Sequence, residues 1–472
     1  MTVVARTLRE AAERFGDRPA VWVDGGSAVT YSALWSRASD AAGALAADGY
    51  GDGAVVALDH PSDVDWLVLH AAVSAVGGVV AGINPKLTDA EKAPVLARLQ
   101  PDLVLTSVPD GGGPVLLPPA RADRVTNVVF TSGTTGEPKG AIFTEGHLEA
   151  ITGIDLGIDP ASDAAWGTGG PMLVSTQFNH IGVSTKLAWY LRTGATLHVL
   201  PRWRPADALR LTAEHGMASV GGVAAHIGLL LREPSFDDFD LSAVKTIVIG
   251  GGPSPAALVE EARRRFGAAY SIRYSSTESG GVGTGTAFDA DDEEALHTVG
   301  RPRPGVEIRI DPSTGELQLR SGAVMAGYWN DPERTAAALD ADGWLRTGDL
   351  GEIDERGLLR LTGRASDMYI RGGYNVHPAE VEAVLIAHPA VHAVAVVPRA
   401  DDVLGERGVA VVMVRPGHDA PTTADLRAFA ADRLAGYKLP DDVVVVDEIP
   451  ITTMDKVDRR ALAAVVAGWP VP

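Results

Sequence analysis

A loop rich in glycine and hydroxyl side chains carries the strongest chemical signal in the sequence. The segment 130–140 reads FTSGTTGEPKG and directly follows an apolar run at 126–130. Glycines let the backbone approach an anion, and hydroxyl groups together with a lysine can donate hydrogen bonds to phosphate oxygens. We therefore expect this loop to bind a polyphosphate. The residues predicted to do so are Thr131, Ser132, Gly133, Thr134, Thr135, Gly136 and Lys139.

The order of residues separates this loop from the P-loop of nucleoside triphosphatases. The P-loop places its lysine between a glycine and a Ser or Thr at the start of a helix. Here Pro138 precedes Lys139, and Gly140 follows it. The sequence therefore disfavours a kinase or a GTPase.

Four further motifs follow the loop, namely YSSTE at 274–278, WLRTGD at 344–349, GR at 363–364 and PITTMDKVDR at 450–459. Together with the loop they resemble the adenylate-forming ligase family, which includes acyl-CoA and aryl-CoA synthetases, luciferases and the adenylation domains of peptide synthetases. The resemblance covers nearly the whole chain, from residue 30 to residue 456. It implies that a carboxylate attacks the α-phosphate of ATP, giving an acyl-adenylate and pyrophosphate. A thiol, usually that of CoA, then takes the acyl group.

The resemblance also implies a nucleotide site. Tyr274 would stack on the adenine with Ser275 beside it, Thr277 would contact the α-phosphate, and Glu278 would hold Mg²⁺ together with Thr134. This agrees with the preference of Mg²⁺ for a few protein oxygens plus phosphate and water. The other implied nucleotide contacts are Gly251, Gly252 and Pro253 at the adenine, Asp349 at the ribose, and Arg364.

The residues after 364 are implied to form a mobile domain that turns about a pivot at 364–367. Ser366 stands in that pivot, where relatives usually have Asp or Lys. Lys456 would bridge the acyl carboxylate and the α-phosphate, because an ammonium group stabilises two anions that are forced together. Asp455 stands where most relatives have Gly, and it adds a negative charge beside the lysine. The implied contacts to the pantetheine arm of CoA are Gly372 and Gly373.

The segment FNHIG at 178–182 resembles the aromatic–histidine motif of the same family, which implies the acyl site. His180 would lie near the carboxyl carbon of the acid. Small side chains around it leave room for a medium-chain, branched or ring-bearing acid. Lys186 either reaches this site to meet a second polar group or is a solvated helix lysine. The predicted acid-binding residues are Phe178, Gly182, Gly222, Val223 and Gly281.

Composition narrows the classes of function. The formal net charge of −20 would repel phosphate backbones and anionic lipid surfaces, so nucleic acid is not an expected partner. The chain has no cysteine, which excludes disulfides, thiolate metal sites and a thioester on the protein itself. The apolar stretches are too short to span a bilayer, and residues 1–16 are typical of an amphipathic helix and not of a signal peptide. We expect a cytoplasmic enzyme. The sequence leaves open whether this enzyme forms a homodimer.

The elements that must position these residues alternate in a pattern typical of an α/β fold. Short Val/Ala/Leu runs followed by helical stretches predict layered parallel α/β subdomains up to about residue 300. After the glycine-rich turn at 250–253, a helix is expected at about 255–266, with Ser254 as its N-cap. Short strands broken by Gly and Pro at 301–364 predict a small β-rich subdomain. The pattern after residue 367 predicts a small α+β domain. We place an N-terminal domain at 1–364 and a mobile C-terminal domain at 365–472.

The sequence therefore predicts an AMP-forming ligase that joins a fatty or ring-bearing carboxylic acid to CoA, using ATP and Mg²⁺. Two alternatives stay open: an adenylating enzyme that transfers to a carrier-protein thiol or an amine, and a degenerate nucleotide-binding homologue, which Asp455 and Ser366 suggest. An amino acid substrate is disfavoured because the segment 178–182 has no carboxylate to bind an ammonium group. The predicted catalytic residues are Lys456, His180, Thr277 and Glu278, and the predicted metal ligands are Thr134 and Glu278.

Overall fold

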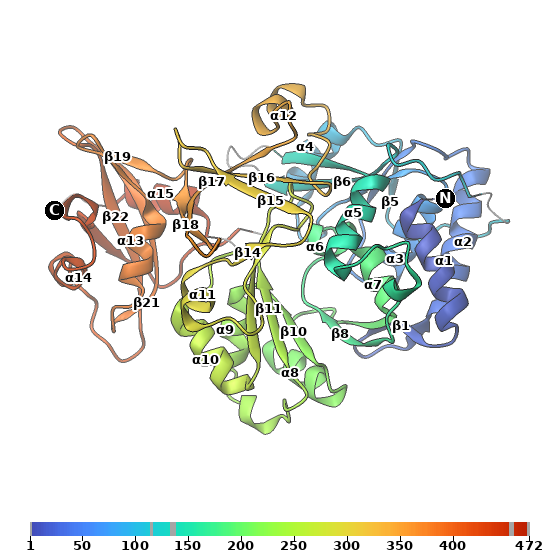
Figure 1. The fold of residues 1–472 in the computed structure, drawn as a ribbon, viewed down its shortest axis with the longest axis horizontal. Helices are drawn as coiled ribbons and strands as arrows, with labels where there is room; N and C mark the ends of the chain where they lie inside the picture. Colours follow the sequence, from blue (N-terminus) through green and yellow to red (C-terminus); the bar gives the residue numbers. More distant parts are fainter. Residues whose placement is uncertain (1, 114–116, 133–137, 453–456, 470–472) are drawn as a thin grey trace. The chain divides into compact units, whose positions relative to one another are not determined.

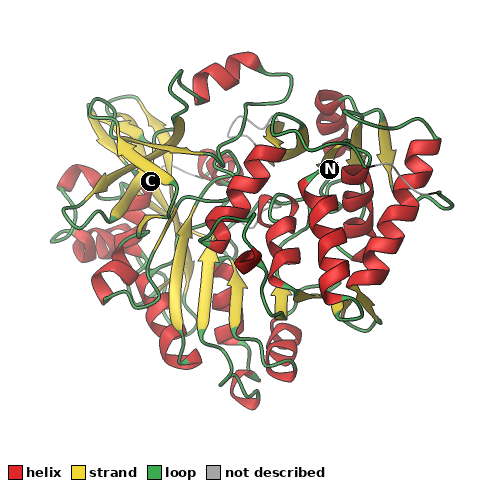
Figure 2. Ribbon diagram, turned by 45° about the vertical axis from the view of Figure 1, so that its right-hand side comes forward, coloured by secondary structure: helices red, strands yellow, loops and turns green. Residues whose placement is uncertain are grey.

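The computed structural model describes residues 2–113, 117–132, 138–452 and 457–469. The chain divides into two compact units (Figure 1). The first comprises Met1–Arg309 and Gln318–Thr347, and the second comprises Ile310–Leu317 and Gly348–Pro472. The α/β fold class is confirmed, with helices and strands mixed throughout (Figure 2). The predicted hinge at 364–367 lies within the second unit and stays a prediction.

A five-stranded sheet in the order β5-β3-β4-β6-β7 bears the predicted phosphate loop. Its strands are β3 (Val55–Leu58), β4 (Val79–Gly82), β5 (Leu103–Leu105), β6 (Val125–Ser132) and β7 (Pro138–Thr144). All residues of β3 and β4 are buried, as expected for parallel strands covered on both faces. The helices of this region are α1 (Val3–Phe15), α2 (Tyr31–Ala47), α3 (Val64–Ala75) and α4 (Asp89–Leu99). The side chain of Asp63 caps α3 by accepting a hydrogen bond from the amide of Trp66 at 3.1 Å.

A four-stranded sheet in the order β2-β1-β9-β8 bears the segment predicted to form the acyl site. Its strands are β1 (Pro19–Val23), β2 (Ala28–Thr30), β8 (Gly170–Val174) and β9 (Ala195–Val199). The helices near it in the chain are α5 (Glu145–Leu156), α6 (Ile181–Ser184) and α7 (Leu187–Thr193). The segment 178–182 follows β8 and leads into α6, so the predicted acyl residues lie where a strand ends and a helix begins.

A third sheet in the order β10-β11-β12-β13-β14 bears the predicted adenine residues. Its strands are β10 (Ser219–Gly222), β11 (Thr246–Gly250), β12 (Ala269–Tyr274), β13 (Thr284–Gly285) and β14 (Arg301–Pro302). Its helices are α8 (Pro205–Glu214), α9 (Ala224–Arg232), α10 (Ala256–Phe266) and α11 (Asp292–His297), and α8, α9 and α10 lie beside β10 and β11 in Figure 1. The predicted helix after the triple glycine is confirmed as α10. Its N-cap is Pro255, so the expectation that Ser254 caps it is wrong.

The next stretch forms a small sheet in the order β15-β16-β17-β18. Its elements are β15 (Val306–Ile310), β16 (Glu316–Ser321), α12 (Pro332–Ala338), β17 (Leu345–Ile353) and β18 (Leu359–Arg364).

The last sheet has the order β20-β19-β22-β21, with β23 paired to β22. Its strands and helices are β19 (Tyr369–Arg371), β20 (Tyr374–Val376), α13 (Pro378–Leu385), β21 (Val391–Asp401), β22 (Gly405–Val414), α14 (Thr423–Ala430), β23 (Asp442–Val445) and α15 (Arg459–Ala467). The β-rich stretch and the α+β C-terminal region are therefore as predicted.

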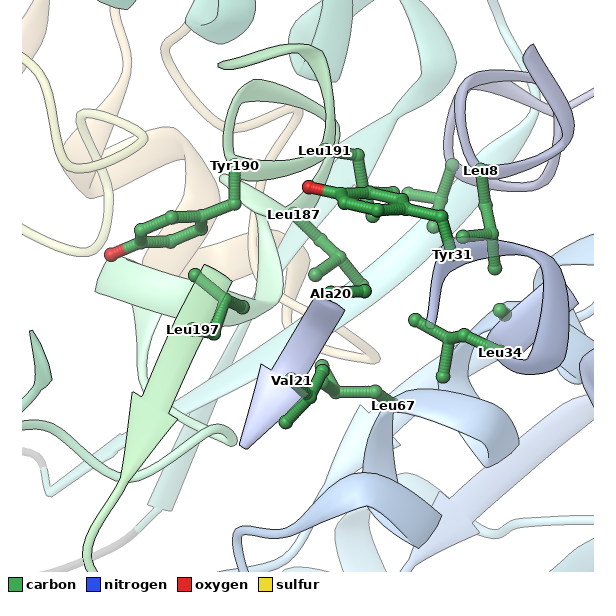
Figure 3. A pocket seen from close by; sticks show the side chains of 12 residues that line it. Leu8, Ala20, Val21, Tyr31, Leu34, Leu67, Leu187, Tyr190, Leu191 and Leu197 are labelled. Carbon is green, nitrogen blue, oxygen red and sulfur yellow. The ribbon is translucent and has the colours of Figure 1, made fainter. Parts of the chain in front are cut away.

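Two hollows in the first unit lie apart from the predicted site. One is an apolar gap of about 10 Å³ on which Leu8, Tyr31 and Leu187 converge (Figure 3). A gap of this size holds about one water molecule and no acyl chain. The other, of about 600 Å³, is lined by residues that include Trp22 and His198. Among the described residues that line these hollows, none is a predicted substrate contact. Within the described part of the chain, no helix combines the length and apolarity needed to cross a bilayer.

Stability should depend on pH through His70 on α3. This side chain is 1% exposed, and its Nε2 faces Asn127 Nδ2 at 3.0 Å. Burial lowers the pKa of His70 from 6.5 to about 4. As the pH falls, the unfolded chain therefore takes up this proton before the folded chain does. The free energy of unfolding has its full value above about pH 6.5 and decreases as the pH approaches 4. We expect a loss of about 3 kcal/mol across this window.

Urea unfolding of the wild type and of His70→Gln, at several pH values between 7 and 4.5, checks this expectation. Glutamine keeps a hydrogen-bonding side chain for Asn127 but cannot titrate. The unfolding free energy of the variant should therefore fall less steeply with decreasing pH. If the unfolding free energies of the two proteins fell equally with decreasing pH, His70 would not be the cause of the pH dependence.

Candidate adenylate-forming site

The predicted phosphate loop closes a hairpin between β6 and β7. The two strands are antiparallel, and Thr131 pairs with Lys139 while Ser132 pairs with Pro138. This register places Thr131 and Lys139 side by side at the end of the hairpin that bears the loop. The residues at its tip, Gly133, Thr134, Thr135 and Gly136, lie outside the described residues.

Tyr328 connects this hairpin to the predicted metal ligand. Its hydroxyl donates a hydrogen bond to Glu278 Oε1 at 2.8 Å, and Lys139 Nζ lies 5.5 Å from the centre of its ring. The backbone of Tyr328 bridges to Ala141 on β7. Burial and the negative charge of Glu278 raise the pKa of Tyr328, so the phenol keeps the proton that it donates. One tyrosine therefore holds the Glu278 carboxylate in place near the phosphate hairpin.

Thr277 and Glu278 lie in a tight turn after β12. The amide of Gly280 donates to the carbonyl of Thr277, and that of Gly281 donates to the carbonyl of Ser276, both at 3.0 Å. Both glycines have positive φ angles, 74° and 69°. Most other residues would be strained in this conformation, so the glycines permit the turn that presents Thr277 and Glu278.

The predicted adenine contacts meet at one edge of the third sheet. The parallel strands β10, β11 and β12 end near Gly222, Gly250 and Tyr274, and their registers align these ends. Gly251 follows β11, and a Cβ added there would lie 3.4 Å from Val223 Cγ1. Ligands bind at the carboxyl ends of parallel strands in many α/β proteins. The residues that gather at this edge are Gly222, Val223, Gly251, Gly252, Pro253, Tyr274 and Ser275.

In the second unit, Asp349 and Arg364 lie opposite each other on β17 and β18. Arg364 Nε donates to Asp349 Oδ1 at 2.8 Å, and the Asp349 residue is 6% exposed. The predicted ribose carboxylate is thus oriented by the other predicted nucleotide residue of the unit. Gly372 and Gly373 have φ angles of 58° and 86° and form the turn between β19 and β20.

The segment predicted to form the acyl site leads into α6. His180 is the N-cap of this helix, and its Nδ1 accepts a hydrogen bond from the amide of Gly182 at 3.2 Å. Phe178 is 1% exposed and packs edge-on against Trp66. The ammonium of Lys186 lies 2.6 Å from a carboxylate oxygen of Asp155, so it is not a solvated helix lysine. The roles of His180 and Phe178 toward an acid stay predictions.

Lys456 and Asp455 lie outside the described residues, so the predicted catalytic role of Lys456 also stays a prediction. Within the first unit, the structure brings together the end of the phosphate hairpin and Glu278. Tyr328 was not predicted from the sequence, and neither was the pairing of Lys186 and Arg303 with Asp155. These contacts join residues far apart in the chain, and no short motif marks them.

Models of two protein families match this chain. The AMP-binding enzyme model matches residues 8–117 and 107–329, and the model of the AMP-binding enzyme C-terminal domain matches residues 380–456. The chain belongs to the AMP-binding enzyme family. For this family member, the predicted enzyme class, an AMP-forming acid–thiol ligase, is also confirmed.

Relatives of this AMP-binding enzyme include acyl-CoA ligases. It is 32% identical to a 3-[(3aS,4S,7aS)-7a-methyl-1,5-dioxo-octahydro-1H-inden-4-yl]propanoyl:CoA ligase of Mycobacterium tuberculosis, over 89% of this chain and 91% of the relative. It is 29% identical to a medium-chain fatty-acid–CoA ligase of Escherichia coli, over 96% of this chain and 88% of the relative. Among solved structures, the amide bond synthetase McbA of Marinactinospora thermotolerans is similar, with 30% identity, a TM-score of 0.85 and coverage of 98% and 99%.

Proposed function

We propose that this enzyme converts a medium-chain or ring-bearing carboxylic acid, ATP and CoA into acyl-CoA, AMP and pyrophosphate. The observation that carries the proposal is the Tyr328–Glu278 hydrogen bond beside the phosphate hairpin, in a chain of the AMP-binding family. The relatives named above support the acid class, because one acts on a ring-bearing propanoate and another on medium-chain fatty acids.

In the first half-reaction, a carboxylate oxygen of the acid bonds to the α-phosphorus, and the bond to pyrophosphate breaks. Lys139 and the hydroxyls of the phosphate loop would bind the phosphates, and Lys456 would bridge the acid and the α-phosphate. In the second half-reaction, the CoA thiol loses its proton and attacks the acyl carbon. AMP then leaves with the oxygen that came from the acid.

Glu278 suits the proposed Mg²⁺ site. Tyr328 occupies its Oε1, and among the described residues no hydrogen bond to Oε2 is observed. A carboxylate oxygen that is oriented but otherwise available is a suitable ligand for Mg²⁺. Glu278 and Thr134 would hold the ion, which would neutralise phosphate charge during attack.

Asp349 should contribute mainly to ATP binding. We expect Asp349→Asn to raise the KM for ATP about tenfold or more, since hydrogen bonds from the ribose to an ionised carboxylate would be lost. The measurement is the ATP dependence of acyl-CoA formation at saturating acid. Asp354→Asn is the matched control, because Asp354 lies in the turn between the same two strands and pairs with Arg360. An unchanged KM in Asp349→Asn would contradict the ribose assignment.

The likeness to McbA favours a second candidate, transfer of the acyl group to an amine. Both candidates share the acyl-adenylate and differ only in the acceptor. A test incubates the enzyme with ATP, Mg²⁺ and a panel of fatty, aryl and ring-bearing acids, with CoA, with simple amines, or with neither. Mass spectrometry should detect acyl-CoA. Amide without acyl-CoA would favour the second candidate, and no acyl product in any arm would contradict both.

A further inference from the structure

A group of charged side chains contacts the glycine-rich segment that follows Thr277 and Glu278. The carboxylate of Asp155, on α5, accepts from Lys186 Nζ at 2.6 Å and from Arg303 at 2.5 Å. The side chains of Asp155, Lys186 and Arg303 are 9%, 14% and 21% exposed. Charges this far from water are costly unless they are paired.

This charged group adjoins residues predicted to bind the acid. A Cβ added to Gly281 would lie 3.1 Å from Lys186 Cε, so the lysine stem covers the side of Gly281 where a side chain would project. The amide of Arg303 donates to the carbonyl of Gly283 in the same glycine-rich turn. Tyr190 donates to the carbonyl of Gly182 at 3.3 Å, and the Asp155 charge adds to the effect of burial in raising the pKa of Tyr190. The charged group therefore contacts the glycine-rich turn that contains Gly281, one of the residues predicted to bind the acid.

The charges in this group do not balance. Two cations, Lys186 and Arg303, share the single carboxylate of Asp155, which leaves one positive charge. Burial favours the neutral form of Asp155, but the two cations outweigh it and hold its pKa below the usual value, so it stays ionised. Among the described residues, Asp155 is the partner observed for the Lys186 ammonium, which has three donors. Donors and charge are therefore left for a ligand oxygen.

We propose that Lys186, oriented by Asp155 and Arg303, selects acids that carry a second oxygen acceptor, a ketone or a second carboxylate, remote from the reacting carboxyl group. This inference rests on the proposed function and specifies its substrate class. A saturated chain would leave the remaining N–H donors of the ammonium desolvated and unsatisfied, whereas an acceptor oxygen would accept from one of them. The ring-bearing substrate named for the M. tuberculosis relative carries two such ketones.

The test compares acids that differ only at the remote end: 3-cyclohexylpropanoate, 3-(4-oxocyclohexyl)propanoate and 3-(4-carboxycyclohexyl)propanoate. For the wild type, kcat/KM for the oxo acid, the carboxy acid or both should exceed that for the plain acid by about 10- to 100-fold. Which of the two leads tells whether a ketone or a carboxylate is bound. In Lys186→Met, this ratio should fall to near one, whereas Lys186→Arg should keep part of it.

Lys92→Met is the matched control. Lys92 lies 2.8 Å from Asp59 and is 16% exposed, so it resembles Lys186 in pairing and burial but not in position. In Lys92→Met, the ratio of kcat/KM for the oxo or carboxy acid to that for the plain acid should equal the wild-type ratio. Each ratio is measured on one preparation, so partial unfolding of a variant affects both terms alike. A wild-type ratio near one, or an unchanged ratio in Lys186→Met, would overturn the inference alone. Failure to form any acyl-adenylate with any acid would instead overturn the proposed function.

Discussion

Glu278→Gln should lower the rate of acyl-adenylate formation by about 10²- to 10³-fold. Glutamine keeps the size of the side chain and an oxygen that can accept from Tyr328, but it removes the charge that would hold Mg²⁺. Without that ion, the phosphate charge that develops during attack is poorly neutralised. Acid-dependent exchange of pyrophosphate into ATP, measured over a range of Mg²⁺ concentrations, reports this step directly.

Two further variants make the result specific. Glu294→Gln removes another buried carboxylate of the first unit, which pairs with Arg301, and it should leave the exchange rate within about threefold. Tyr328→Phe keeps the Glu278 charge but frees its carboxylate to rotate, so the rate should fall only about 3- to 10-fold. If Glu278→Gln exchanged at the wild-type rate at low Mg²⁺, the metal assignment would be wrong.

Lys456→Ala should abolish adenylation while sparing the second half-reaction. The family resemblance places this lysine between the two anions that must meet in the first step, and its charge has no such role once the acyl-adenylate exists. We expect a loss of about 10²-fold or more in adenylation. Thioester formation from presynthesised acyl-adenylate should change by less than about threefold.

Lys438→Ala serves as the control for this experiment. Lys438 lies in the second unit and forms an ion pair with Glu380, so its removal tests the general effect of losing a cation there. Both half-reactions should continue in this variant. Equal loss of both half-reactions in Lys456→Ala would show that the lysine does not act in the first step alone.

Local sequence signals predicted the elements that bear the site. The apolar runs that became β3 and β4 are buried throughout, and the glycine-rich turn before α10 was predicted together with its helix. The phosphate loop was predicted from its residue types, their order and the apolar run before it, and the register of β6 and β7 places Thr131 and Lys139 side by side. These features depend on residues close together in the chain, which is why a pattern can identify them.

The contacts that complete the site depend on tertiary packing. Tyr328 and Glu278 are 50 residues apart, and Asp155 and Arg303 are 148 apart. Nothing in the local sequence of Tyr328 distinguishes a tyrosine that orients a carboxylate from one that fills a core. Likewise, Lys186 could be read as a solvated helix lysine until the structure placed Asp155 against it. Long-range pairs of this kind are set by the fold, so single motifs do not reveal them.

In the proposed reaction, an acid oxygen bonds to the α-phosphorus of ATP before CoA takes the acyl group. The most direct measurement uses an acid labelled with ¹⁸O at both carboxylate oxygens, together with ATP, Mg²⁺ and CoA, and determines the mass of the AMP released. The proposed reaction predicts AMP that carries one ¹⁸O atom, in an amount equal to the acyl-CoA formed. Unlabelled AMP alongside acyl-CoA would contradict it, because the acyl group would then have been activated without an acyl-adenylate.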